Sequence, residues 1–317
     1  IGCLSFLFLL YGPYKNFREW LITTAMSTMN HQYYCKWFYS DEYINNILGE
    51  NYIDDKNAET DVSLIDHKEK ITYENEFERQ ILERDKDALY KVIKFEVNGC
   101  DAYLGVVYDA SKVHVGVSKW IGNSGQYIYD MAKEQNAVLA INGGGFNESR
   151  TGGNPIGVTI ANGKIYSREP ASNGYGLIGF DKDDTLVLKK NITAEEALSQ
   201  GIRDAVTMAP FLIVNGNPSF IKGNGGWGYA ARTAIGQRKD GIILFLVVDS
   251  NEFRTKGASM LELTQIMQNY GAVNAANLDG GTSSVMVVEG QMINDPIDSA
   301  LRHRTRGIPT FFKVVDD

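Results

Sequence analysis

NLDGGTSSVM, residues 277–286, is the stretch on which the interpretation of this chain depends. Its apolar approach ends in Asp279, which is followed by two glycines and three hydroxyl side chains. A hairpin turn accounts for an Asp-Gly pair, but it requires neither the second glycine nor the row of hydroxyls. Two interpretations are therefore open: a plain turn joining 273–278 to 284–288, or a reaction centre built on Asp279.

Two further apolar segments end in the same way. AVLAI (137–141) is followed by Asn142 and three glycines, and IILFLVV (242–248) is followed by Asp249. Strand ends bring distant residues into one cleft, and glycine there admits a ligand to the backbone or supplies a positive φ. Glycine after a strand is usually only a turn, so each motif alone is weak. Together the three predict a shared site.

Three charged features have a functional and a structural interpretation. Arg232 follows a glycine-rich loop, and its fork suits a phosphate or a carboxylate as well as it suits a surface ion pair. The loop is no Walker motif, because no Gly-Lys-Ser/Thr follows. Glu262 is either a catalytic acid or the last residue of a capping box that begins at Ser259. The basic run 302–306 either holds an anionic ligand or balances local acids.

Composition limits the class of protein. The chain has 317 residues, 44% of them hydrophobic, enough for one large domain with an appendage or for two domains. A formal charge of −8 argues against nucleic acid as a partner. The four histidines and three cysteines show neither metal-ligand spacing nor C-x-x-C, so we expect no cofactor, no metal site and no disulfide framework.

The chain divides into three parts. Residues 1–50 begin with eleven residues that carry no charge, too short for a span of about 20 residues. We expect a truncated membrane anchor and stalk, although a buried helix or a signal-peptide remnant also fits. Residues 51–89 mix many charges with few apolar groups and predict a charged linker, partly helical over 73–89. Residues 90–317 predict a folded domain.

The third part shows the periodicity of strands and a few helices. Asn162-Gly163 and Asn215-Gly216 are hairpin signals. A helix is expected after Ser124 and another at 259–270. Strands are expected at 90–97, 102–109, 112–119, 137–142, 242–249, 273–279, 284–290 and 309–315. This pattern favours an α+β domain with a mixed β-sheet and interspersed helices.

The order of the motifs resembles that of the phosphodiester glycosidases over roughly residues 90–317. The matching segments are AINGGGF (140–146), GNPIGVTIANGKI (153–165), ARTAIG (231–236), VVDSNEFRTKGASMLEL (247–263) and NLDGGTSSVM (277–286). Residues 11–40 resemble the stalk of membrane-anchored Gram-positive members. Two departures bear on the substrate: Asp249-Ser250-Asn251 stands where the family usually has Asp-Gly-Arg, and Thr282 replaces a third glycine.

The resemblance implies a hydrolase that removes a sugar from a sugar-1-phosphodiester, in a bacterial cell-surface polysaccharide or wall polymer. The apolar start followed by a charged spacer further predicts a single-pass membrane protein whose catalytic domain is extracellular. One alternative is a polysaccharide-binding module without activity. The other is a phosphodiesterase or transferase that cleaves the phosphorus–oxygen bond, a reaction that favours a metal clamp, for which Asp249 and Asp279 supply hard oxygen ligands.

Cleavage of the anomeric carbon–oxygen bond releases a phosphate monoester, which is a good leaving group. The site then needs a cradle for the phosphate and a carboxylate at the anomeric carbon. The residues expected to be catalytic are Asp279, Asp249 and Glu262. Those expected to bind substrate are Asn142, Gly143, Gly144, Arg232, Gly280, Gly281, Thr282 and Ser283.

Overall fold

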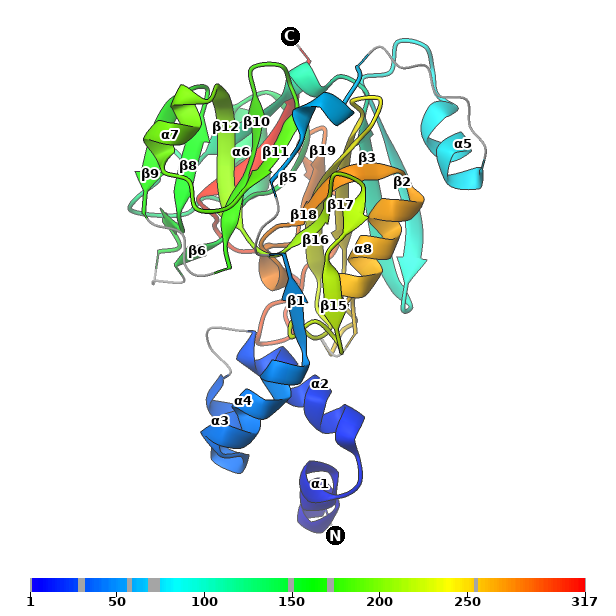
Figure 1. Cartoon of the computed structure of the whole chain (residues 1–317), viewed down its shortest axis with the longest axis vertical. Coiled ribbons are helices and arrows are strands. Elements are labelled where there is room, and N and C mark those ends of the chain that lie inside the picture. Colours follow the sequence, from blue (N-terminus) through cyan, green and yellow to red (C-terminus); the bar gives the residue numbers. More distant parts are fainter. Residues whose placement is uncertain are drawn as a thin grey trace.

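The computed structural model describes residues 2–27, 32–55, 59–67, 75–147, 151–169, 174–253 and 256–316. A body of β-sheets carries helices on its outside, and helices α1 to α4 form a separate group at one end (Figure 1). The α+β class is thereby confirmed. The described strand pairings are all antiparallel, whereas the sequence led us to expect a mixed sheet.

The largest sheet holds the ends of the strands that carry Asp249 and Asp279. Its spatial order is β14 (Asn217–Pro218), β13 (Phe211–Val214), β18 (Ala272–Asn277), β16 (Arg232–Arg238), β17 (Ile243–Val248), β3 (Cys100–Val107) and β2 (Tyr90–Val97). Every residue of β17 is buried, because Phe245 and Val247 face one apolar cluster while Leu244 and Leu246 face another. Burial of both faces explains the unbroken apolar run in the sequence.

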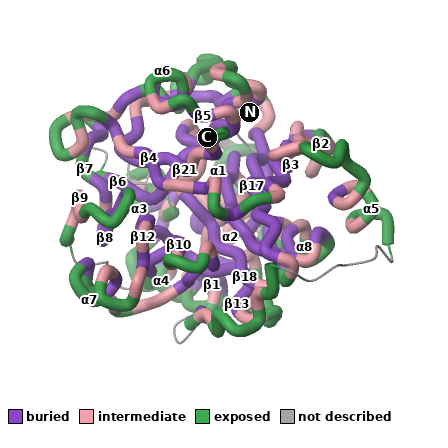
Figure 2. The backbone as a smooth tube through the Cα atoms, turned by 90° about the horizontal axis from the view of Figure 1, so that it is seen from above, coloured by how far each residue is buried: buried purple, intermediate pink, exposed green. Residues whose placement is uncertain are grey.

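Two five-stranded sheets pack against the first. One has the order β20 (Gln291–Met292), β19 (Met286–Val288), β5 (Ala137–Asn142), β21 (Thr310–Val315) and β4 (Val113–Val117). The other has the order β11 (Leu186–Lys189), β10 (Gly176–Asp181), β12 (Ile202–Met208), β8 (Val158–Ala161) and β9 (Lys164–Arg168). Phe312 joins all three sheets, since its ring centre lies 6.2 Å from that of Phe180 and 6.4 Å from that of Phe245. Figure 2 shows the buried backbone gathered in the central strands.

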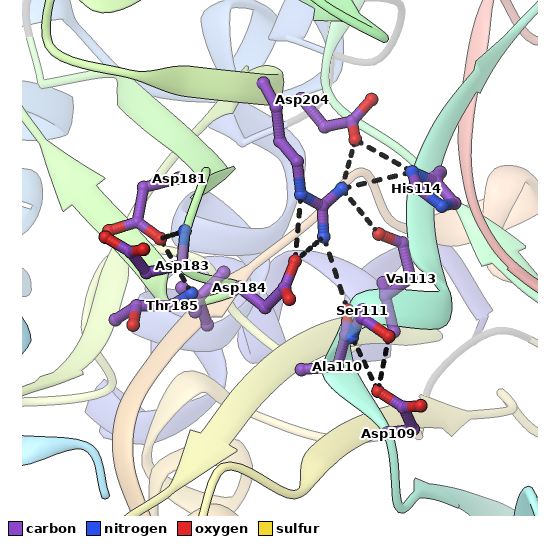
Figure 3. A network of polar contacts seen from close by, with 12 residues as sticks. Asp109, Ala110, Ser111, Val113, His114, Asp181, Asp183, Asp184, Thr185 and Asp204 are labelled. Atoms are coloured by element: carbon purple, nitrogen blue, oxygen red, sulfur yellow. Dashed lines mark hydrogen bonds and ion pairs between the residues drawn. The ribbon is translucent and has the colours of Figure 1, made fainter. Parts of the chain in front are cut away.

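A polar network links the two five-stranded sheets near one edge (Figure 3). Arg203 on β12 donates to the carboxylates of Asp184 and Asp204 and to the carbonyl oxygen of Val113 on β4. His114 lies 3.1 Å from the Asp204 carboxylate. Burial opposes ionisation of Asp204, but the hydrogen bonds and the Arg203 charge outweigh it and lower its pKa. The network therefore stabilises the packing of the sheets.

Local signals in the sequence match the described elements closely. Both Asn-Gly pairs form hairpin turns with positive φ, at Asn162 and Asn215 among others. Helix α6 (Ile128–Glu134) begins later than expected, because Tyr127 is its N-cap and Ser124 is not. The remaining elements of the body are α7 (Ala194–Ser199), α8 (Met260–Asn269), β6 (Phe146–Asn147), β7 (Asn154–Pro155), η2 (Ala110–Lys112) and η3 (Gly281–Ser283).

Residues 2–27 and 32–50 form a small helical unit with its own apolar core. It contains α1 (Gly2–Tyr11), α2 (Lys15–Met26), α3 (Gln32–Phe38) and α4 (Asp41–Glu50). Leu10, Ile22 and Cys35 are fully buried at its centre. None of the described helices combines the length and the apolar character needed to cross a bilayer.

The segment predicted as a charged linker makes ordered contacts with the body. Its elements are β1 (Tyr52–Asp54), η1 (Val62–Leu64) and α5 (Glu76–Leu82), and β1 pairs with β15 (Phe220–Lys222). Asp55 accepts a hydrogen bond of 2.7 Å from the Phe211 amide and forms a buried ion pair of 2.9 Å with Lys190. Ile81 of α5 is fully buried. The boundary at residue 90 stays a prediction. These contacts show that part of the segment before residue 90 packs against the folded body.

Candidate active site

Asp279 lies on a crossing between two sheets. Strand β18, which precedes it, belongs to the seven-stranded sheet, whereas β19, which follows it, pairs with β5 in another sheet. A hairpin requires that its two strands pair with each other. The interpretation of Asp279-Gly280 as a plain hairpin turn is therefore wrong.

The backbone around Asp279 is fixed by its neighbours. Its amide donates to the carbonyl oxygen of Gly143, and its own carbonyl oxygen accepts a hydrogen bond of 2.7 Å from the Asn142 side chain. The Asn142 oxygen accepts in turn from the Thr233 hydroxyl and the Val285 amide. Asn142 is only 1% exposed, so it positions the Asp279 loop. We had expected it to bind substrate; its polar groups are engaged in holding the loop instead.

Gly143 and Gly144 serve the packing of strands. Their amides donate to the carbonyl and hydroxyl oxygens of Thr310, so they do not form the expected phosphate cradle. A Cβ atom at Gly143 would lie 2.6 Å from the Thr310 hydroxyl, and one at Gly144 would lie 2.6 Å from the Thr207 carbonyl oxygen. Both glycines are needed because the backbones approach closely.

The second glycine pair has a different use. Gly281 has a φ of +62° and donates its amide to the Ala231 carbonyl oxygen, which turns the chain after Asp279. A Cβ atom at Gly280 would lie 3.6 Å from Nη1 of Arg232. The nearest atom to that position is the Ala231 carbonyl oxygen at 3.1 Å, so Gly280 permits this close approach of the backbone and lies beside the Arg232 guanidinium; its role in binding substrate stays a prediction.

Arg306 is the member of the basic run that reaches Asp279. Its Nε donates to the Ser283 hydroxyl at 2.7 Å, and its Nη2 lies 3.3 Å from the Asp279 carboxylate. The guanidinium also lies over the Phe146 ring, 4.7 Å from its centre. The side chains of Arg306 and Asp279 are 31% and 17% exposed, so a ligand can reach both. Ser283, expected to bind substrate, instead orients Arg306.

The other basic residues of the run have structural partners. Arg302 and Arg304 both bind the Asp298 carboxylate, and His303 lies beside Asp295. Each of the two interpretations that the sequence left open therefore applies to a part of the basic run. Arg306 faces the candidate site, and Arg302 and Arg304 balance a local acid.

Arg232 is buried without an ion pair to any described carboxylate. Its Nε donates to the Ala258 carbonyl oxygen at 3.2 Å, and its Nη2 donates to those of Trp227 and Gly228. Burial lowers its pKa to about 10, although the charge of Asp279 opposes this. Arg232 therefore stays protonated at neutral pH, and it is not part of a surface ion pair. Among the described residues, its direct hydrogen-bond partners are backbone carbonyl oxygens, next to the charge of Asp279.

Asp249 follows β17, which lies two strands away from β18 in the same sheet, and it supports the site from there. Because β16 lies between β17 and β18, the backbones at Asp249 and Asp279 are about 10 Å apart. Asp249 accepts hydrogen bonds from the Asn294 side chain at 2.7 Å and from the Asp295 amide at 3.0 Å. Burial raises the pKa of Asp249, although these two hydrogen bonds act to lower it. Asn294 also donates to the Ser284 carbonyl oxygen, which connects Asp249 to the Asp279 loop.

Glu262 is the cap of α8. One of its carboxylate oxygens accepts from the amide and hydroxyl of Ser259, and the other accepts from the Asn98 side chain. The capping box is complete, so the structural alternative is confirmed. These contacts account for both oxygens and leave a catalytic role without support.

The remaining hydroxyls hold the loop. Thr282 donates to the Ile297 carbonyl oxygen and accepts from Thr305 through its own carbonyl. Ser284 is fully buried, and its hydroxyl has no partner among the described residues. Thr282 is therefore a loop anchor where we expected a substrate contact.

Tyr175 is a neighbour of Asp279 that the sequence gave no reason to select. Burial raises its pKa, and the charge of Asp279 raises it further. The Tyr175 ring lies 3.7 Å from the position that a Cβ atom at Gly145 would occupy. Arg254, which lies in one of the family-like motifs, is outside the described residues. Within the described part of the chain, no three His, Cys, Asp or Glu side chains converge as metal ligands.

Comparisons with known proteins identify the family and the fold. The family model for phosphodiester glycosidases matches residues 135–315. The uncharacterized protein YomE of Bacillus subtilis, derived from the SPbeta prophage, is 30% identical over 205 residues, which are 62% of this chain and 31% of that protein. N-acetylglucosamine-1-phosphodiester α-N-acetylglucosaminidase of Mus musculus is 25% identical over 189 residues, 54% of this chain and 35% of that enzyme. The chain thus spans about a third of the length of these relatives.

A solved structure shows the same fold. The catalytic domain of the zebrafish N-acetylglucosamine-1-phosphodiester α-N-acetylglucosaminidase, described as auto-inhibited by its pro-peptide, superimposes with a TM-score of 0.61 at 19% identity. The match covers 74% of this chain and 86% of that domain. The family model spans more than half of the chain and includes Asn142, Arg232, Asp249, Asp279 and Arg306. The chain belongs to the phosphodiester glycosidase family.

Proposed function

We propose that the protein is a hydrolase that removes a sugar from a sugar-1-phosphodiester. The observation that carries the proposal is the charge balance around Asp279. Arg232 and Arg306 contribute two positive charges and Asp279 one negative charge, so the cluster has a net charge of 2 − 1 = +1. A phosphodiester carries one negative charge and would neutralise the cluster. The guanidinium forks of the buried Arg232 and the partly exposed Arg306 are well suited to such an anion.

The contact between Arg306 and Asp279 can be exchanged for a contact with substrate. At 3.3 Å it is longer than the roughly 2.7–2.9 Å of a strong charge-assisted hydrogen bond. A phosphate oxygen that binds Arg306 would release the Asp279 carboxylate toward the anomeric carbon. Asp279 then acts as base or nucleophile.

The proposed reaction conserves atoms and charge. The bond between the anomeric carbon and the phosphate oxygen breaks, and its electron pair stays on the phosphate. Water supplies the hydroxyl group of the free sugar, and the proton released from water goes to the Asp279 carboxylate. The leaving phosphate monoester gains negative charge, which Arg306 and the buried Arg232 stabilise.

The substrate and the location are also part of the proposal. We infer a polymer of the bacterial cell surface as substrate, with the catalytic domain outside and the chain anchored through its N-terminal segment. The support is the charge-free apolar stretch at 1–11, of which Gly2–Tyr11 forms helix α1 of the helical unit. Protease treatment of intact cells should release the domain, and a fully protected domain would contradict this location.

A panel of sugar-1-phosphodiesters tests the activity with wild type and Asp279→Asn. The substitution is nearly isosteric and keeps the backbone contacts to Gly143 and Asn142, so the fold should survive. Turnover should fall about 10²–10⁴-fold, because an amide is neither base nor nucleophile. Asp109→Asn is the matched control, since Asp109 caps a surface turn through Ser111. A folded Asp279→Asn protein with normal turnover would contradict the proposal.

Product analysis separates the two modes of cleavage. Free sugar and a phosphate monoester are expected from carbon–oxygen cleavage. A sugar phosphate would show phosphorus–oxygen cleavage instead. Binding of polysaccharide without any turnover across the panel would favour a binding module.

A further inference from the structure

Arg232 is held by a loop that is rich in glycine. Its Nη2 donates to the carbonyl oxygens of Trp227 and Gly228. Both acceptors belong to residues 223–228, which we call the glycine loop. Four residues of this loop are glycines with positive φ: Gly223, Gly225, Gly226 and Gly228. Glycine restricts the backbone least and loses the most conformational freedom on folding. The position of the Arg232 guanidinium therefore depends on what packs against the glycine loop.

The helical unit holds the glycine loop through Asn224, at the end of the body that carries β15 (Figure 1). The Asn224 side chain donates to the Thr23 hydroxyl on α2 at 2.8 Å, and the Asn224 amide donates to the side-chain oxygen of Asn51, the C-cap of α4, at 2.9 Å. The Asn224 side-chain oxygen accepts from the Gly226 amide at 3.0 Å. Thr23 is fully buried and Asn51 is 4% exposed, so water does not compete for these bonds. One asparagine thus joins two helices of the unit to the backbone of the loop.

Helix α2 also reaches the two residues whose carbonyl groups hold Arg232. The Ser27 hydroxyl, at the end of α2, donates to the Trp227 carbonyl oxygen at 3.3 Å, and Arg232 donates to the same oxygen. A Cβ atom at Gly228 would lie 2.1 Å from the Thr24 hydroxyl oxygen, so this close approach of the loop to α2 requires glycine. The helical unit and Arg232 therefore contact the same stretch of backbone.

One nitrogen of the Arg232 fork is left for a ligand. Its Nε donates to the Ala258 carbonyl oxygen and its Nη2 to the glycine loop, whereas Nη1 has no hydrogen-bond partner within the described part of the chain. A Cβ atom at Gly280, the residue after Asp279, would lie 3.6 Å from Nη1. Because the guanidinium group is planar and rigid, the carbonyl groups that hold Nη2 and Nε also set the direction of Nη1.

We propose that the helical unit is a working part of the candidate site. Thr23, Ser27 and Asn51 are positioning residues: they hold the glycine loop in the shape that directs Nη1 of Arg232 at the substrate phosphate. This role rests on the proposed function, in which Arg232 stabilises the leaving phosphate. It extends the site to a part of the chain outside the family model, which matches residues 135–315. The positioning residues act through the loop and do not touch substrate.

Binding of inorganic phosphate to the full chain, measured by titration calorimetry, tests this role. Thr23→Val keeps the shape of the side chain but leaves the buried Asn224 donor without its partner, so the Kd for phosphate should rise at least about fivefold as the loop shifts. Thr23→Ser restores the hydroxyl and should bind phosphate like wild type.

Thr264→Val is the matched control. Thr264 is also a buried helical threonine whose hydroxyl donates to the carbonyl oxygen four residues before it, as Thr23 does, but it lies on α8. The control should bind phosphate like wild type. Thermal melting checks that each variant is folded. If Thr23→Val does not fold, Ser27→Ala decides by itself: Ser27 is exposed, and loss of its hydrogen bond to Trp227 should raise the Kd about two- to fivefold.

Arg232→Lys separates failure of this proposal from failure of the proposed function. Arg232→Lys should weaken phosphate binding, and Thr23→Val/Arg232→Lys should bind no more weakly than Arg232→Lys alone, because Thr23 acts through the guanidinium fork. An equal effect of Thr23→Val in both backgrounds would assign Thr23 to general packing and overturn the proposal. Wild-type affinity in folded Thr23→Val and Ser27→Ala, with Arg232→Lys weakened, would overturn it and leave the proposed function intact. Unchanged affinity in Arg232→Lys, or no phosphate binding by wild type, would overturn the assignment of Arg232 to phosphate and the positioning role with it.

Discussion

Replacement of Arg306 by lysine keeps a positive charge beside Asp279 but removes the planar fork. The guanidinium contacts Ser283 through Nε, Asp279 through Nη2 and the Phe146 ring through its face at the same time. An ammonium group is a point charge on a flexible stem and cannot maintain this arrangement. Arg306→Lys therefore tests whether the geometry of the group matters as well as its charge.

The expected loss follows from the contacts. The hydrogen bond from Arg306 to Ser283 involves a charged donor, and such bonds contribute about 1.5–3 kcal/mol. If this bond orients the guanidinium toward the phosphate in the transition state, its loss raises the barrier by about that amount. A tenfold change in rate corresponds to about 1.36 kcal/mol, so kcat/KM should fall about 10- to 150-fold. The cation–π contact adds little, because the side chain is 31% exposed.

The assay is steady-state hydrolysis of the best sugar phosphodiester from the panel, with thermal melting to confirm the fold. Arg304→Lys is the matched control, because Arg304 belongs to the same basic run but binds Asp298. The control should stay within about twofold of wild type, because Arg304 contacts Asp298 and not the Asp279 carboxylate. Normal kcat/KM in a folded Arg306→Lys enzyme, with Asp279→Asn inactive, would refute the assignment of Arg306 to the phosphate.

The other predictions concern residues around the site and the start of the body. Glu262→Ala should lower the free energy of unfolding in urea by about 0.5–2 kcal/mol through loss of the α8 cap and leave turnover intact, whereas a large fall in turnover would restore a catalytic role. Burial raises the folded-state pKa of Asp249 above its ordinary value of about 4, so the stabilisation that its protonated form contributes is fully present below that pH and is lost as pH rises through the raised pKa. The difference in unfolding free energy between wild type and Asp249→Asn should therefore shrink as pH rises above about 4, and parallel curves would contradict this. The fragment 90–317 should fold, but its free energy of unfolding should be lower than that of the fragment 51–317 by up to about 3–5 kcal/mol, because it leaves the buried Lys190 without Asp55. Equal urea midpoints of the two fragments would show that the segment before residue 90 is a plain linker.

Much of the fold could be predicted because it depends on neighbours along the chain. The apolar run at β17, the hairpins at Asn162 and Asn215 and the cap at Glu262 each rest on residues a few positions apart. Element positions and the α+β class followed from such patterns. The pairing of β1 with β15 did not, because a three-residue strand inside a charged segment has no periodic signal.

The sequence by itself determined that Asp279, Asp249 and Asn142 stand at strand ends, since each closes an apolar run. Only the tertiary structure decided what each does there. It places the strands on either side of Asp279 in different sheets and brings Arg306 of the basic run to the Asp279 carboxylate. It also uses Asn142 to hold the Asp279 loop, and Gly143 and Gly144 to pack the backbone against Thr310 and Thr207. The physical reason is that a strand end fixes the direction of a side chain only locally. Its partners come from residues such as Thr310 and Ser283, which are far away in the chain and are brought close by sheet packing.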